Sequence, residues 1–87
     1  MKTLTIYTIY DSKAEVYGQP FLQLNQACCE RSIRSMLSGN DHYSKAPEDF
    51  TCYEIGSYDE STGTITAHDT PKAIYQFIQF TGGASDE

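Results

Sequence analysis

The sequence predicts a single small α+β domain with the element order β-α-β-β-α. Residues 4–10 are a run of β-branched and aromatic side chains, which is typical of a strand. Apolar residues repeat at helical spacing within residues 26–38. Residues 50–58 and 64–67 are two β-rich runs joined by a short loop that contains glycine, the pattern of a hairpin. We therefore expect a three-stranded antiparallel sheet with one or two helices packed on one face.

The predicted helix has a recognisable beginning, apolar stripe and end. Asn25 is a favourable N-cap, because its side-chain oxygen can accept a hydrogen bond from an N–H of the first turn. Four apolar residues lie at the spacing i, i+4, i+7 and i+8, namely Cys29, Ile33, Met36 and Leu37. Gly39 stands where a left-handed residue commonly ends a helix.

Two further segments connect these elements to the rest of the chain. Gly18 and Pro20 interrupt the chain after the first strand, and we expect Phe21, Leu22 and Leu24 to return it to the core. After the helix, residues 40–49 read as a polar loop.

The last part of the chain contains one clear turn and one ambiguous segment. In the turn at residues 59–63, Gly63 is the residue expected to need a positive φ. Thr70 followed by Pro71 is a favourable start for a helix, but residues 71–80 also fit a strand, and both alternatives stay open. We expect residues 1–81 to form one domain and residues 82–87 to form a flexible acidic tail.

The composition limits the classes of partner and compartment. Twelve acidic and six basic side chains give a formal net charge of -6, which repels polyanions and argues against non-specific coating of nucleic acid. Three cysteines, two of them adjacent, make a poor disulfide framework. We recognise no signal peptide and no apolar run of about 20 residues, so we expect a reducing cytoplasm and no membrane partner. A homo-oligomer is compatible with the exposed edges of a short sheet, although it would multiply the charge repulsion.

The sequence predicts no enzyme, no cofactor and no metal site. The spacing of His42, Cys52, His68 and Asp69 matches no zinc pattern, and both histidines are expected in solvated turns. Cys28 and Cys29 point about 100° apart on a helix, so only the second should face the core. No glycine-rich phosphate loop and no nucleophile elbow is found.

Seven tyrosines leave two interpretations open. Tyrosine rings pack at the rim of a core with the hydroxyl in water, but they also form stacking platforms for single-stranded nucleic acid. A platform would need nearby positive charge. The candidates for such a site are the lysines Lys13, Lys45 and Lys72 and the tyrosines Tyr10, Tyr17 and Tyr43.

Three short segments taken together resemble a known phage family. They are YDSKAE at residues 10–15, PEDF at residues 47–50 and YDESTG at residues 58–63. In this order they resemble the small nonstructural protein of gokushoviruses, which are microviruses with single-stranded DNA, and the resemblance runs from about residue 6 to residue 72. Ala46 stands where that family often has histidine, so a role resting on that histidine is not carried over.

The resemblance implies an accessory protein that acts in the host bacterial cytoplasm and is not part of the virion. Its implied role is to regulate viral DNA replication or single-stranded genome synthesis. Two modes of action stay open: contact with single-stranded DNA, or binding to a phage replication protein or to the host replication machinery without touching DNA. The net charge of -6 favours the second mode.

Loops held by a rigid sheet are where recognition residues usually lie, so we expect the binding surface on the turn after the first strand and on residues 45–49. The predicted binding residues are Tyr10, Asp11, Lys13, Tyr17, Lys45, Glu48 and Asp49. The lysines would contact phosphate or carboxylate groups, and the tyrosines would stack or anchor.

Overall fold

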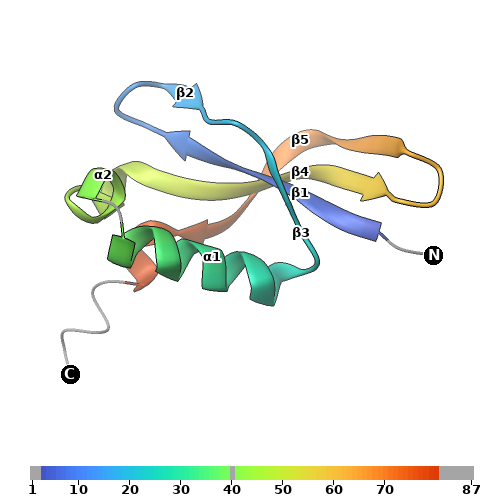
Figure 1. Ribbon diagram of the computed structural model, residues 1–87. Coiled ribbons are helices and arrows are strands. Elements are labelled where there is room, and N and C mark those ends of the chain that lie inside the picture. Colours follow the sequence, from blue (N-terminus) through green and yellow to red (C-terminus); the bar gives the residue numbers. More distant parts are fainter. Residues whose placement is uncertain (1–2, 40, 81–87) are drawn as a thin grey trace.

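The computed structural model describes residues 3–39 and 41–80, and within them five strands form one antiparallel sheet (Figure 1). The strands are β1 (Thr3–Asp11), β2 (Val16–Tyr17), β3 (Phe21–Gln23), β4 (Phe50–Asp59) and β5 (Thr64–Gln76). The helical elements are α1 (Gln26–Gly39), the one-turn α2 (Asp41–Ser44) and the 3-10 segments η1 (Pro47–Asp49) and η2 (Phe77–Phe80). The predicted α+β class is confirmed, but the order β-α-β-β-α and the three-stranded sheet are wrong.

The sheet is built around β1. One edge of β1 pairs with β4 along its whole length, from Thr3 opposite Asp59 to Asp11 opposite Phe50. The other edge pairs first with β3 and then with β2, so these two short strands follow one another along the same side of β1. Strand β5 pairs with the far side of β4 and is an edge strand.

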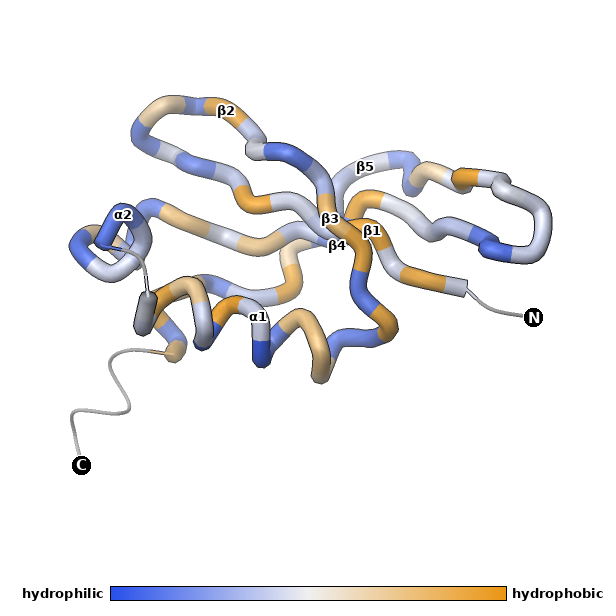
Figure 2. The backbone as a smooth tube through the Cα atoms, viewed as in Figure 1, coloured by the Kyte–Doolittle hydropathy of each residue, from blue (hydrophilic) through white to orange (hydrophobic). Residues whose placement is uncertain are grey.

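Helix α1 begins where it was predicted, but it includes Gly39, which does not take the left-handed conformation expected at the end of the helix. The Asn25 Oδ1 atom accepts a hydrogen bond of 3.0 Å from the backbone N–H of Cys28, which confirms the N-cap. Cys29 and Ile33 are buried, and Met36 and Leu37 pack against the same core. Figure 2 shows hydrophobic colour on β1, β3 and α1, whereas α2 is mostly hydrophilic.

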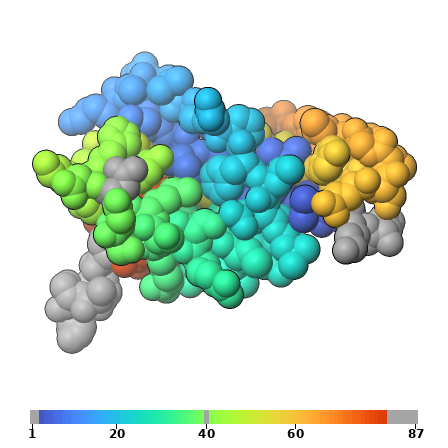
Figure 3. All heavy atoms as spheres, viewed as in Figure 1, coloured from blue at the N-terminus to red at the C-terminus, as the bar shows by residue number. Residues whose placement is uncertain are grey.

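The core lies between α1 and one face of the sheet. Its buried residues are Tyr7, Ile9, Cys29, Ile33, Phe50, Cys52 and Phe77. Figure 3 shows this side of the molecule, with α1 and the segment around β3 in front and the end of the β4–β5 hairpin extending beyond them. The opposite face of the sheet carries no helix of the described residues.

The hairpin turn agrees with the sequence. Gly63 has φ 75°, and its backbone N–H donates a 2.7 Å hydrogen bond to the Asp59 carbonyl oxygen. The Asp59 side chain also accepts a 2.8 Å hydrogen bond from the backbone N–H of Ser61. A carboxylate at the first turn position and glycine at the left-handed position are the residue types that such a turn requires.

The ambiguous C-terminal segment is mostly a strand. Strand β5 runs to Gln76 and is followed by η2, so the helix beginning at Thr70 and Pro71 does not form. The register between β4 and β5 places Lys72 opposite Glu54 and Ala67 opposite Gly56, so residues 68–71 bulge out of the ladder. Proline is tolerated there because β5 is an edge strand and the bulge needs no ladder N–H.

The predicted tail at residues 82–87 lies outside the described residues. No helix within the described part of the chain is long and apolar enough to cross a membrane.

Tyr7 is fully buried at the centre of β1. Its hydroxyl makes no hydrogen bond of good geometry within the described residues. Burial raises the pKa of Tyr7 to about 12, and the opposing interaction with the Thr5 side chain is smaller. The hydroxyl is therefore neutral at physiological pH and costs free energy because it is dehydrated without a strong partner.

We predict that Tyr7→Phe makes the protein more resistant to alkali. Below pH 10 Tyr7 is protonated in both states, whereas above pH 10 it ionises more readily in the unfolded chain. Stability is therefore lost as pH rises from 10 to 12, by up to about 2.7 kcal/mol from this group alone. Urea unfolding of Tyr7→Phe between pH 9 and 12 should show a shallower loss, with stability at pH 7 unchanged or higher. Tyr17→Phe removes an exposed hydroxyl and is the control; an equal change in both variants would contradict the prediction.

Candidate functional site

The two predicted binding segments meet at one end of the sheet. The backbone N–H and the Oγ atom of Ser12 both donate to the Asp49 carbonyl oxygen, at 2.9 and 3.2 Å. This contact joins the turn after β1 to the segment η1. The YDSKAE turn therefore lies beside Pro47–Asp49, held there by backbone contacts.

Asp11 has a structural role in this turn. Its Oδ1 atom accepts hydrogen bonds from the backbone N–H groups of Lys13 and Ala14, at 3.0 and 3.2 Å. Its carbonyl oxygen accepts a 2.7 Å hydrogen bond from the N–H of Glu15, which has a left-handed φ of 59°. The side chain of Asp11 therefore stabilises the conformation of the turn, and its Oδ1 atom is already used in hydrogen bonds within the turn rather than directed at a binding partner.

The charges around this end of the sheet do not favour phosphate. Lys13, Lys45 and Glu48 are exposed, and Asp49 is half-buried. Within residues 10–17 and 45–49, two lysines are accompanied by four carboxylates. A surface with this balance repels a phosphate backbone at long range, so the predicted role of the lysines as phosphate contacts has little electrostatic support.

Three tyrosines from three neighbouring strands form a cluster close to this end. The ring centroids of Tyr10 and Tyr17 are 4.6 Å apart, and Tyr53 meets them edge-on at 6.1 and 5.6 Å. Tyr17 is 46% exposed, so the tyrosine cluster (Tyr10, Tyr17 and Tyr53) presents aromatic surface to solvent. The sequence predicted the first two residues but not Tyr53.

Tyr43 is not part of this cluster. Its ring packs at 4.9 Å from Phe50 and at 5.3 Å from Phe77, on the helix side of the sheet. Lys72 is also separate, because it pairs with Glu54 in the β4–β5 ladder. The stacking-platform interpretation would need Tyr43 and the lysines near Tyr10 and Tyr17, and the structure does not bring Tyr43 or Lys72 there.

The face of the sheet that carries the tyrosine cluster is uncharged where the strands pair. Residues directly opposite one another in an antiparallel ladder point to the same face, so the register identifies the members of this face. They include Leu4, Ile6, Thr8, Tyr10, Tyr17, Leu22, Thr51, Tyr53, Gly56, Tyr58, Ile65, Ala67 and Ala73. Among the described residues, the paired positions of this open face carry no charge, although eighteen side chains of the protein are charged.

An apolar groove of about 330 Å³ lies at the other end of the open face. It is lined by Ile6, Pro20, Phe21, Leu22, Ile55 and Ile65. Ile65 is 65% exposed and Leu22 is 45% exposed. The prediction that Leu22 and Leu24 return to the core is wrong, because only Phe21 of that segment packs against the core cluster. Exposed aliphatic side chains gathered in a groove are typical of a protein contact surface.

The two histidines make separate contacts, and two of the three cysteines lie close together. His68 lies in β5, where its Nε2 atom is 2.7 Å from the Glu54 Oε2 atom, and His42 lies in α2. Both histidines are exposed, as expected, but neither lies in a turn. The Sγ atoms of Cys29 and Cys52 are 3.4 Å apart, and the pKa of Cys52 is raised by its hydrogen bond to Cys29 and by burial. Within residues 3–39 and 41–80, no group of three or more His, Cys, Asp or Glu side chains could hold a metal ion.

Comparison with known protein families gives a match over almost all of the described chain. The family model described as Phage ORF5 protein matches residues 4–80. The chain belongs to the Phage ORF5 protein family. The matched span includes every described residue except Thr3, and therefore both the tyrosine cluster and the apolar groove. No curated protein and no solved structure matches the chain.

Proposed function

We propose that this protein is a non-enzymatic accessory factor of a gokushovirus-type microvirus. It acts in the host bacterial cytoplasm, outside the virion, and regulates viral DNA replication or single-stranded genome synthesis. Membership of a phage family supports a role in phage infection, and the three motifs at residues 10–15, 47–50 and 58–63 support the gokushovirus origin.

The proposed contact is with single-stranded DNA, and the tyrosine cluster carries this proposal. Unpaired bases stack on aromatic side chains of an open sheet, and each stacked base contributes about 1–3 kcal/mol. Tyr10, Tyr17 and Tyr53 lie side by side on such a face. Because few basic groups lie nearby, binding rests on the bases and depends only weakly on the phosphates.

Substitution in the cluster tests this proposal. Tyr17→Ala and Tyr53→Ala should each weaken binding of a labelled oligothymidine by about 5- to 150-fold, measured by fluorescence anisotropy. For the wild type, raising the salt from 50 to 200 mM should reduce the affinity by less than about tenfold, because only one or two phosphates are neutralised.

Two controls separate stacking from general damage. Tyr17→Phe keeps the ring and should retain binding. Tyr58→Ala removes a tyrosine of the same face outside the cluster and should also retain binding. If the wild type fails to bind the oligonucleotide at 50 mM salt, contact with DNA is refuted.

A second candidate function is a protein-interaction module that binds a phage or host replication protein without touching DNA. The apolar groove favours it, because Leu22 and Ile65 are large aliphatic side chains held in contact with water. Under this alternative, the double variant Leu22→Ser/Ile65→Ser should lose crosslinking to the viral replication initiator. The tyrosine variants should retain that crosslinking.

A further inference from the structure

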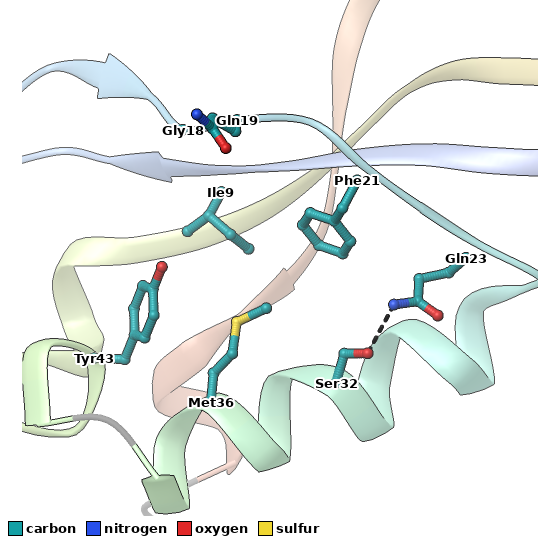
Figure 4. A pocket seen from close by; sticks show the side chains of 8 residues that line it. All are labelled: Ile9, Gly18, Gln19, Phe21, Gln23, Ser32, Met36 and Tyr43. Atoms are coloured by element: carbon teal, nitrogen blue, oxygen red, sulfur yellow. Dashed lines mark hydrogen bonds between the residues drawn. The ribbon is translucent and has the colours of Figure 1, made fainter.

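A separate pocket lies on the helix side of the sheet, between α1 and the segment that links β2 to β3 (Figure 4). Its volume is about 480 Å³. The lining residues are Ile9, Gly18, Gln19, Phe21, Gln23, Ser32, Met36 and Tyr43. This volume lies within the range of small-molecule sites and is large enough for one aromatic heterocycle.

The lining of the pocket contains no charged side chain. Burying a phosphate, carboxylate or ammonium group against such a lining would cost free energy without a compensating partner. The pocket therefore favours an uncharged ligand. Figure 4 shows the rings of Phe21 and Tyr43 on two sides, with the Met36 thioether between them, so a flat ligand would meet aromatic and sulfur surface.

The polar groups of the pocket are amides and hydroxyls. The Gln23 Nε2 atom donates a 2.8 Å hydrogen bond to the Ser32 Oγ atom, which fixes the orientation of the amide. An oriented amide still offers an acceptor oxygen and a second N–H, and Gln19 adds another amide at the rim. Adjacent donors and acceptors of this kind complement the edge of a nucleobase, whose own edge alternates donors and acceptors.

We propose that this pocket binds one unstacked nucleobase. The proposal deepens the proposed function and rests on it where the base belongs to single-stranded DNA. Tyr17 of the tyrosine cluster is followed directly by Gly18 and Gln19 of the pocket. The cluster and the pocket lie on opposite faces of the sheet, so a DNA strand stacked on the cluster would reach the pocket by passing round the sheet edge at residues 17–19. A free nucleoside is the other source of the same chemistry.

The test uses the full chain and two kinds of probe, observed by NMR. The four deoxynucleosides and an eight-residue oligothymidine are titrated separately while the Gln23 side-chain amide and the Met36 methyl signals are followed. We expect both probes to shift these two signals. Gln23→Leu should weaken the nucleoside response at least tenfold, and Ser32→Ala should weaken it less. Gln26 is an exposed glutamine at the start of α1, outside the pocket, so Gln26→Leu is the matched control and should behave as the wild type.

The outcomes separate this proposal from the proposed function. If the nucleosides shift the pocket signals and the oligonucleotide does not bind, the pocket stands as a nucleoside site and contact with DNA fails. If the oligonucleotide shifts the tyrosine signals and binds Gln23→Leu as tightly as the wild type, while neither it nor any nucleoside shifts the pocket signals, the pocket proposal is overturned and contact with DNA stands. If none of the nucleosides shifts the Gln23 and Met36 signals at millimolar concentration, the pocket proposal is also overturned.

Discussion

Gly56→Ala should destabilise the protein by about 3 kcal/mol or more, because the new methyl group has no space. A Cβ atom at this position would lie 2.5 Å from the Thr66 carbonyl oxygen and 3.2 Å from the Ala67 Cα atom. Both atoms belong to the backbone of β5, which cannot turn aside as a side chain can. The β4–β5 ladder would have to separate at this point, next to the register shift between Glu54 and Gly56.

The stabilisation gained by removing a glycine from the unfolded chain is too small to compensate for this loss of stability. Replacing glycine by alanine restricts the unfolded chain and stabilises a protein by about 0.4–1 kcal/mol when the native backbone accepts the methyl group. A net loss of 3 kcal/mol corresponds to a fall of about 12–24 °C in the melting temperature of a domain this size.

Gly39→Ala is the matched control for this substitution. A Cβ atom there meets nothing within 4 Å, and the stability should be unchanged or slightly higher. The two variants are compared by urea unfolding followed by circular dichroism. A Gly56→Ala protein that unfolds within 0.5 M urea of the wild type would show that the strands can move apart at little cost.

Phe77→Ala should destabilise the protein by about 3–5 kcal/mol, because it leaves a cavity in the core. Phe77 is 0% exposed, and its ring lies 5.3 Å from Tyr43 and 5.9 Å from Phe50. The total stability expected for 87 residues is only about 4–13 kcal/mol, so this loss is a large part of the whole.

The adjacent residue provides the control for the cavity effect. Ile78 is 40% exposed, so Ile78→Ala removes an aliphatic side chain from the same 3-10 segment and should cost less than about 1 kcal/mol. Phe77→Leu should fall between the two. Equal losses for Phe77→Ala and Ile78→Ala in thermal unfolding would mean that the η2 segment does not complete the core.

The parts of the fold that the sequence predicted are those defined by local signals. Helix α1 begins at an N-cap that Asn25 supplies and buries the stripe containing Cys29 and Ile33. The hairpin turn has a carboxylate at Asp59 and a left-handed glycine at Gly63. In each case, neighbouring residues determine the conformation without help from distant parts of the chain.

The elements that the sequence did not predict depend on distant partners. Strands β2 and β3 contain two and three residues, and each exists because β1 offers it a free edge. The segment at Thr70 and Pro71 has the residue types of a helix start, but pairing with β4 and burial of Phe77 outweigh that local preference. Gly56 carried a readable signal, since an isolated glycine in a strand often marks a bulge or a close approach of another backbone.

The candidate site was predicted in part for the same reason. Tyr10 and Tyr17 flank one turn, so their proximity follows from the local sequence. Tyr53 joins them only because the register places it opposite Thr8, two residues along the same face from Tyr10. The surroundings of Lys13 and Lys45 likewise depend on the hydrogen bond between Ser12 and Asp49. No local sequence pattern predicts this contact between distant residues.

The pairing of β1 with β4 has a consequence for the order in which the protein folds. Thr3 pairs with Asp59 and Asp11 pairs with Phe50, so this ladder closes a loop that contains α1 and most of the first half of the chain. Such non-local ladders form slowly, on the order of milliseconds to seconds, whereas a hairpin such as β4–β5 forms in about 1–10 μs. We therefore expect an interval during folding in which the β4–β5 hairpin has formed and the edge of β4 that pairs with β1 is still unpaired. During that interval the β1 strand of another copy can occupy the edge, so rapid synthesis at high concentration favours strand exchange between chains over closure within one chain.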